Sequence, residues 1–183
     1  MRRVALLLPV VALAFAVGLA LVLGAATLAE ARPRTRAELA FELDTALVRR
    51  ATIIASDELP DAALAVYDAQ SPRIYLHRRL LAQMGPALSA FLLAHEQGHL
   101  AYHHARQRGF GLQATPMPAS KLREYEFVAD CYAVRTLQRD NPAAVVAAVR
   151  FFQRRRNLPG DAEHPPMGER ADSLLACLAR TRP

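Results

Sequence analysis

The sequence predicts an α+β fold in which a small sheet packs against a mainly helical core. Three short runs between residues 51 and 77 have the composition and the flanking turn residues of strands. From residue 86 onward, longer runs carry apolar residues at the spacing of buried helices. At 183 residues the chain has the length of one domain. The strands are expected at Ala51–Ala55, Ala63–Asp68 and Arg73–His77, and a turn around Ser71 and Pro72 joins the last two.

The chain begins with a segment that has the features of a signal sequence or a membrane anchor. A double arginine precedes residues 4–29, which contain no charged side chain. This run is longer than the apolar core of a cleaved signal and could span a bilayer once, yet Ala29-Glu30-Ala31 offers a small-x-small cleavage site. Both alternatives remain open. We expect residues 1–31 to direct export, and residues 32–183 to form a domain outside the cytoplasmic membrane, periplasmic or otherwise extracytoplasmic.

The first helix of this domain is expected from Thr35 to about Arg50. Thr35 and Glu38 form a capping box, and Leu43 and Leu47 belong to its apolar stripe. Four further helices follow the strands. They are expected from Pro86 to near Gly109, from Ser120 (the N-cap) to Arg139, from Pro142 (capped by Asn141) to Arg156, and from Gly168 to Arg180. Residues 109–119 and 157–166, which contain glycine and proline, are expected to be loops.

The helix that starts at Pro86 contains the most informative motif, His95-Glu96-Gln97-Gly98-His99. Side chains at i and i+4 share a helical face, so both imidazoles can hold one metal ion, and Glu96 lies about 100° further round, beside that ion. Zinc held by two histidines has room for a third protein ligand and a water, whose pKa it lowers toward about 7. A carboxylate next to this water can take its proton, as peptide-bond hydrolysis requires. The alternative explanation is a chance match on a core helix.

A third ligand is expected from the helix that starts near Ser120. Glu126 and Asp130 share one face of it and have apolar neighbours, and buried carboxylates need partners. Glu126 can therefore reach the metal, while Asp130 accepts a hydrogen bond from the far nitrogen of a ligand histidine and fixes its tautomer. Glu124 is the rival ligand, but it lies on the far side of the helix and lacks an aspartate four residues later.

Three motifs occur in a fixed order in this chain. His-Glu-x-x-His at residues 95–99 precedes Glu-x-x-Ala-Asp at residues 126–130, and His164-Pro165-Pro166 follows with Arg170 soon after. As a set they resemble the gluzincin metallopeptidases of the HtpX and CAAX-prenyl-endopeptidase type, here in a short single-domain form. The resemblance covers roughly residues 60–178. Gln97 departs from the small or aliphatic residue that is usual in the family, and the multi-span membrane helices of its large members are missing.

The resemblance implies a zincin-like fold and a zinc-dependent endopeptidase, a hydrolase that acts on polypeptides. It implies one Zn²⁺ per chain, held by His95, His99 and Glu126, with Glu96 as general base. His164 would donate a hydrogen bond to the oxyanion that forms in the transition state. Arg170 would bind substrate or brace the cleft. The strand Arg73–His77 would be the edge strand that pairs with the substrate backbone, through Ile74, Tyr75 and Leu76.

The other histidines are not expected to bind metal. His103 and His104 are predicted to lie at a helix end, near its carbonyl dipole, and His77 is given the same interpretation. The longer metzincin motif is excluded, because Tyr102 and Ala105 stand where it needs glycine and a third histidine.

The positive charge of the chain does not indicate a nucleic-acid partner. The formal net charge is +6, and Lys121 is the single lysine among the basic residues. Aromatic side chains do not alternate with the arginines, so we expect no nucleic-acid binding. A basic domain next to an anionic membrane remains possible, with residues 4–29 as the contact to the cytoplasmic membrane.

Cys131 and Cys177 are the two cysteines of the chain. They fall on two helices that are expected to pack together, in a protein that is expected to reach an oxidising compartment. A disulfide and two buried free thiols are both open alternatives.

Two other functions remain alternatives to peptide hydrolysis. The first is a non-catalytic, membrane-anchored envelope module with a structural zinc, and the second is a hydrolase of non-peptide amides. The intact Glu96 argues against the first, because a structural zinc site needs no base next to an open coordination position.

Overall fold

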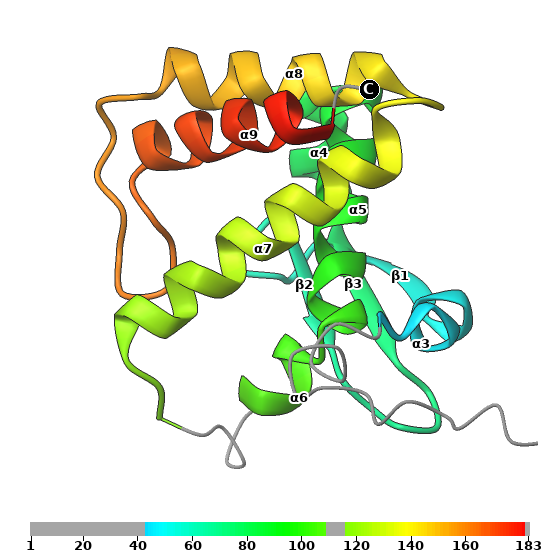
Figure 1. The fold of residues 1–183 in the computed structure, drawn as a ribbon. Helices are drawn as coiled ribbons and strands as arrows, with labels where there is room; N and C mark the ends of the chain where they lie inside the picture. The colour runs from blue at the N-terminus through cyan, green and yellow to red at the C-terminus, as the bar shows by residue number, and fades with distance from the viewer. Residues whose placement is uncertain (1–42, 109–115, 182–183) are drawn as a thin grey trace, which may run out of the picture. The chain divides into compact units, whose positions relative to one another are not determined.

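The computed structural model describes residues 43–108 and 116–181, and its fold is α+β, as the sequence predicts. Figure 1 shows the sheet on one side of the central helix α5, with α8 and α9 beside each other at the end of α5 that is farther from α6. The strands are β1 (Thr52–Ser56), β2 (Ala63–Val66) and β3 (Arg73–His77). The helices are α3 (Thr45–Arg50), α4 (Arg78–Met84), α5 (Pro86–Ala101), α6 (His104–Arg108), α7 (Ala119–Leu137), α8 (Pro142–Arg154) and α9 (Met167–Thr181).

The sheet has the strand order β1-β3-β2, with β1 parallel and β2 antiparallel to β3. The turn between β2 and β3 is held by Asp68, whose Oδ1 accepts hydrogen bonds from the backbone of Gln70 (2.9 Å) and Ser71 (3.1 Å). Side chains that bond their own turn in this way are typical of aspartate.

The expectation that Arg73–His77 is an edge strand is wrong, because β3 is the central strand. Along Ile74, Tyr75 and Leu76 its backbone lies between β1 on one side and β2 on the other. These three residues therefore cannot receive a substrate strand. The alternation of residues along a strand does not show which strands lie on its two sides. The sequence therefore did not reveal that β1 pairs with β3 on the side opposite to β2.

Two apolar clusters hold these elements around α5. The larger one joins α5 to α7, α8 and α9 through side chains such as Phe91, Val134, Phe152 and Leu174. The smaller one packs α3, β3 and α5 together through Leu47, Ile74 and Leu100. Burying a side chain of this size contributes about 1.5–3 kcal/mol. Since α5 takes part in both clusters, it is the element that fixes where the other helices lie.

The helices α5 and α7 approach each other closely at Gly98. A Cβ atom at this position would lie 3.0 Å from the Cα of Ala129 and 3.1 Å from the Cβ of Tyr132. A larger residue at this position would press against the backbone of Ala129, so glycine permits the close approach of the two helices. This contact brings the face of α7 that carries Glu126 and Asp130 against the face of α5 that carries His95 and His99.

Several boundaries differ from the expected ones. The helix α3 begins only at Thr45, because Asp44 caps it with a hydrogen bond from the amide of Leu47 to Oδ1 (2.7 Å), and Leu43 is exposed. The capping box at residues 35–38 lies outside the described residues. The expected helix to Gly109 ends at Ala101, where a turn with His103 at φ 56° separates α5 from α6.

Two further differences concern the start of α7 and the presence of α4. The helix α7 begins at Ala119, so Ser120 lies inside its first turn and forms no cap. The helix α4 was not expected at all. By contrast, Asn141 caps α8 as predicted, with its side chain accepting from the amide of Ala144 (3.3 Å).

Cys131 of α7 and Cys177 of α9 form a disulfide, with a Cα–Cα distance of 5.7 Å. This decides between the two alternatives that the sequence leaves open. The bond ties together the two helices at positions 46 residues apart.

Removing the disulfide should lower the free energy of unfolding by about 4 kcal/mol, because a cross-link between residues 46 apart restricts the unfolded chain. The measurement is urea unfolding of the wild type and of a Cys131→Ala/Cys177→Ala variant. Wild type with added reductant is the matched control and should unfold like the variant. Alkylation of both cysteines in the folded, unreduced protein would contradict the disulfide.

Within the described residues, no helix combines the length and the hydrophobicity needed to cross a membrane. The apolar run 4–29 and the expected boundary after residue 31 lie outside the described residues.

Candidate metal centre

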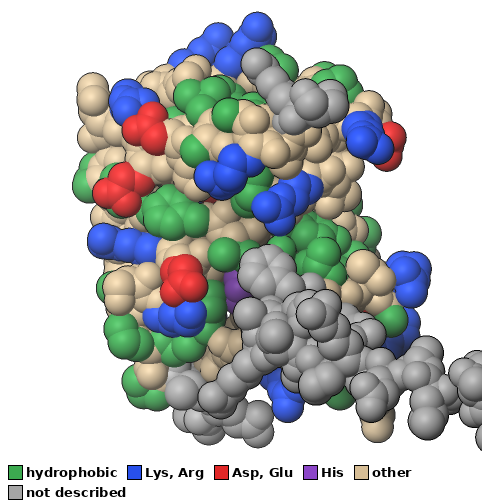
Figure 2. Space-filling view, in the orientation of Figure 1, with side chains coloured by type: hydrophobic (Ala, Val, Ile, Leu, Met, Phe, Trp, Pro, Cys, Tyr) green, Lys and Arg blue, Asp and Glu red, His purple; other side chains and the backbone are tan. Residues whose placement is uncertain are grey.

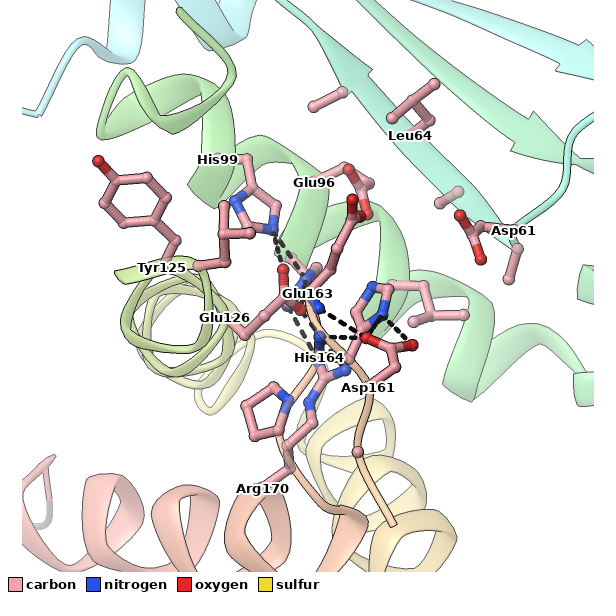
Figure 3. A pocket seen from close by; sticks show the side chains of 18 of the residues that line it. Asp61, Leu64, Glu96, His99, Tyr125, Glu126, Asp161, Glu163, His164 and Arg170 are labelled. Atoms are coloured by element: carbon pink, nitrogen blue, oxygen red, sulfur yellow. Dashed lines mark hydrogen bonds and ion pairs between the residues drawn. The ribbon is translucent and has the colours of Figure 1, made fainter. Parts of the chain in front are cut away.

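The ligand atoms of His95 and His99 on α5 and of Glu126 on α7 lie close together. Figure 3 shows His99 and Glu126 pointing toward one another. The Nε2 atoms of His95 and His99 are 3.1 Å apart. The Glu126 carboxylate lies 3.3 Å from the Nε2 of His95 and 3.2 Å from the Nε2 of His99. One ligand atom from each residue lies within 4.8 Å of the other two. The three residues expected from the sequence to hold a metal are therefore brought together.

Asp130 lies behind His95, one helical turn along α7 from Glu126. Its Oδ1 is 2.9 Å from the Nδ1 of His95. Arg170 of α9 holds the same carboxylate from the other side, donating from Nε to Oδ2 (2.9 Å) and from Nη2 to Oδ1 (2.6 Å). With Nδ1 of His95 turned to Asp130, Nε2 is the nitrogen that faces the centre and can bind a metal.

Arg170 is buried and takes part in the hydrogen-bond network of Asp130 and His95. Besides Asp130, it pairs with Glu126 at 3.6 Å, and its guanidinium lies 4.5 Å from the ring centroid of Phe152. Of the two roles expected for Arg170, these contacts favour bracing the cleft over binding substrate.

Burial and neighbouring charges act in opposite directions on the pKa values of Asp130, Glu126 and His95. Burial by itself raises the pKa of Asp130, but Arg170 and His95 outweigh it and lower that pKa. Burial also raises the pKa of Glu126, and His95 and His99 bring it well below its ordinary value. For His95, burial lowers the pKa, and Glu126 and Asp130 more than reverse this effect. Both carboxylates are therefore ionised and favour a positive charge between them.

These residues fit a divalent metal. Two imidazole nitrogens and an ionised carboxylate converge in a buried place, and the carboxylate favours a cation among them. Two nitrogens and one oxygen are a donor set that zinc accepts, with a fourth position left open.

Glu96 lies next to this centre on α5 and is buried. Figure 3 shows its side chain leaving α5 beside His99 and pointing toward the β2 side of the pocket. Glu96, His99 and His164 line the same cavity, which has a volume of about 870 Å³. Figure 2 shows histidine at the surface on this face of the molecule, next to hydrophobic side chains.

His164 reaches this cavity from the loop between α8 and α9. Asp161 holds it in place, with Oδ1 accepting from the backbone amide of His164 (2.6 Å) and Oδ2 lying 3.0 Å from its Nδ1. The hydrogen bond from that amide, followed by the one from the imidazole, lowers the pKa of Asp161 to about 2. Gly160 lets the loop close, since a Cβ there would lie 2.3 Å from the carbonyl oxygen of His164.

The remaining candidates lie elsewhere. Glu124 is exposed and bonds Lys121 at 2.8 Å, so it is not the third ligand. His103 lies 3.8 Å from Asp44, and His77 lies 3.8 Å from Asp57. Neither histidine belongs to the cluster of His95, His99 and Glu126.

Sequence reasoning missed three contacts at this site. Asp161 orients His164, Arg108 of α6 bonds Glu163 of the same loop, and His104 contacts the back of His99 at 3.3 Å. For Asp161, its place three residues before His164 was an available signal, because aspartate often caps such turns. No sequence signal indicated the contact of His104, because it depends on the break after α5.

Comparison with protein-family models, with curated proteins and with solved structures finds no match to this chain.

Proposed function

We propose that this protein is a zinc-dependent endopeptidase of the gluzincin type. The observation that carries the proposal is the convergence of His95, His99 and Glu126 next to Glu96 at the wall of one cavity. A purely structural zinc site has four protein ligands and is closed to water. Three ligands and an adjoining carboxylate in a cavity are the arrangement of a hydrolytic zinc site.

Each residue of the site has a role in this proposal. Zinc, when bound, supplies a Lewis acid that makes a water acidic and polarises the scissile carbonyl. Glu96 takes the proton of the attacking water and passes it to the leaving amine. His164, whose Nδ1 is engaged by Asp161, offers its other ring nitrogen to the oxygen that becomes negative. Asp130 and Arg170 hold His95 in its tautomer.

The edge that could bind a substrate backbone is β2. In an antiparallel pair the bonded residues alternate. Since the amide of His77 donates to the carbonyl of Ala62 (2.9 Å), Ala63 and Ala65 turn their backbone groups away from β3. Both residues line the cavity, and β2 packs against α5. An extended peptide could add to this edge beside the metal centre.

The cavity also offers an apolar region for substrate side chains. It is lined by residues of α4, α5, α8 and the start of α9, namely Met84, Leu88, Leu92, Phe151 and Met167. A polypeptide with apolar residues near the cleaved bond fits this lining.

Proline at Ala65 should raise the KM for a peptide substrate and leave zinc binding unchanged. Proline removes the outward N–H of β2 without breaking a bond to β3. Ile53→Pro is the matched control on β1, whose Ile53 also faces outward, because the neighbouring Thr52 donates to Pro72 (2.9 Å). Steady-state kinetics on both variants decides this prediction. An equal KM for the two would contradict binding at β2.

The disulfide supports an exported protein, because such bonds persist in oxidising compartments. We therefore keep the proposal that residues 1–31 direct export, by a cleaved signal or as an anchor.

Peptide hydrolysis should depend on one zinc per chain. The experiment incubates the purified full-length chain with denatured proteins and identifies new N-termini by mass spectrometry. We expect cleavage that a chelator abolishes and zinc restores. Zinc binding without any cleavage would favour a non-catalytic module, and cleavage of non-peptide amides alone would favour the other hydrolase.

A further inference from the structure

The two ligand histidines have different partners at their far nitrogens. The Nδ1 of His95 faces the carboxylate of Asp130, whereas the Nδ1 of His99 faces the Nδ1 of another histidine, His104, at 3.3 Å. His104 is 6% exposed and belongs to the wall of the metal cavity. It is not one of the three residues whose ligand atoms converge.

A break in the chain places His104 behind His99. In a continuous helix, a residue five positions after His99 would point about 140° away from it. Instead α5 ends at Ala101, and His103 adopts a φ of 56° before α6 begins. This turn brings the His104 ring to a centroid distance of 5.4 Å from the ring of His99.

Aromatic stacking holds the His104 ring in this position. It lies parallel to the ring of Tyr125 at a centroid distance of 4.0 Å, with an interplanar angle of 10°. The ring of Tyr102 stacks on it at 5.6 Å. Tyr125 is itself hydrogen-bonded to Gln107 of α6. The position of His104 is therefore built by α6 and α7 together.

The protonation of a metal-bound histidine determines which of these two Nδ1 atoms donates the hydrogen bond. A histidine that binds metal through Nε2 carries its remaining proton on Nδ1, and this N–H needs an acceptor. The atom within reach of His99 Nδ1 is the Nδ1 of His104, which accepts when the proton of His104 is on Nε2.

We infer that His104 is a positioning residue that fixes the tautomer and the ring orientation of His99, as Asp130 does for His95. This inference rests on the proposed metal centre. The neutral acceptor adds no charge to a centre that already holds Glu126 and Asp130, so it orients His99 without a further buried anion.

Two substitutions separate this role from simple packing. His104→Phe keeps a ring between Tyr102 and Tyr125 but removes the acceptor. His104→Asn removes most of the stacking but can place its amide oxygen near the former Nδ1. The zinc dissociation constant, measured by competition with a chromogenic chelator, and the absorption spectrum of the Co²⁺-loaded protein are the readouts.

We expect His104→Phe to weaken zinc binding by about 10–100-fold and to change the Co²⁺ spectrum. His104→Asn should stay closer to wild type in both measurements, even where its Tm is lower. His77→Asn is the control, because it makes the same chemical change at a histidine that lies outside the cluster of His95, His99 and Glu126. It should bind zinc as wild type does.

The reverse order would overturn the inference, since tight binding by His104→Phe with weak binding by His104→Asn indicates a packing role. Equal affinities for the two variants would also overturn it. Because the readout is metal binding, a wild type that binds zinc but cleaves nothing would refute the endopeptidase alone. A wild type that binds no zinc would refute both.

Discussion

Replacing Glu96 by glutamine should leave zinc bound and lower kcat by about 10²–10⁴-fold, because it removes the proton acceptor but none of the three ligands. Glutamine has nearly the same size, and Glu96 is not one of the residues whose atoms converge on the metal position. The measurement combines zinc content per chain with steady-state hydrolysis of a peptide that the wild type cleaves.

Glu124→Gln is the matched control for this variant. It makes the same chemical change at an exposed position of α7, where Glu124 pairs with Lys121. It should keep full activity. A Glu96→Gln protein with wild-type kcat would rule out Glu96 as the general base.

Replacing Asp130 by asparagine should lower the free energy of unfolding by about 3–5 kcal/mol, because Arg170 then keeps a buried charge without its main partner. Zinc affinity should fall by about 10–100-fold in the same variant, since His95 loses the carboxylate that orients it. Urea unfolding in the presence of a chelator isolates the first effect, and chelator competition measures the second.

Asp172→Asn provides the comparison for Asp130→Asn. Asp172 pairs with Arg156 at 2.7 Å, but both side chains are at least half exposed. Water replaces such a partner easily, so this variant should unfold almost like wild type. If Asp130→Asn were equally harmless, the network of Asp130 and Arg170 would not stabilise the fold.

Spacing within single helices was enough to predict much of the candidate site. The i, i+4 relation places His95 with His99 and Glu126 with Asp130, and it requires only that each pair lies on a helix. The apolar surroundings of Glu126 indicated burial, and the structure buries it. These predictions depend on local geometry, which a single sequence contains.

The features that the sequence did not predict depend on contacts between distant segments. The central place of β3 follows from the pairing of β1 with it, which periodicity does not specify. The break at His103 replaces an expected helical turn, because Ala101 at the end of α5 instead accepts a hydrogen bond from the amide of Asp44 (3.1 Å). The contact between His99 and His104 exists only because of that break.

The position of Arg170 on α9 has a consequence for the order in which the protein is made. Arg170 follows its partner Asp130 by 40 residues, so a ribosome completes α5 and α7 before it adds the arginine. Until then Asp130 lacks the guanidinium that holds both of its carboxylate oxygens, and packing it into the core is less favourable. We therefore expect a nascent chain to assemble the cluster of His95, His99 and Glu126 in its final form only after α9 has been synthesised.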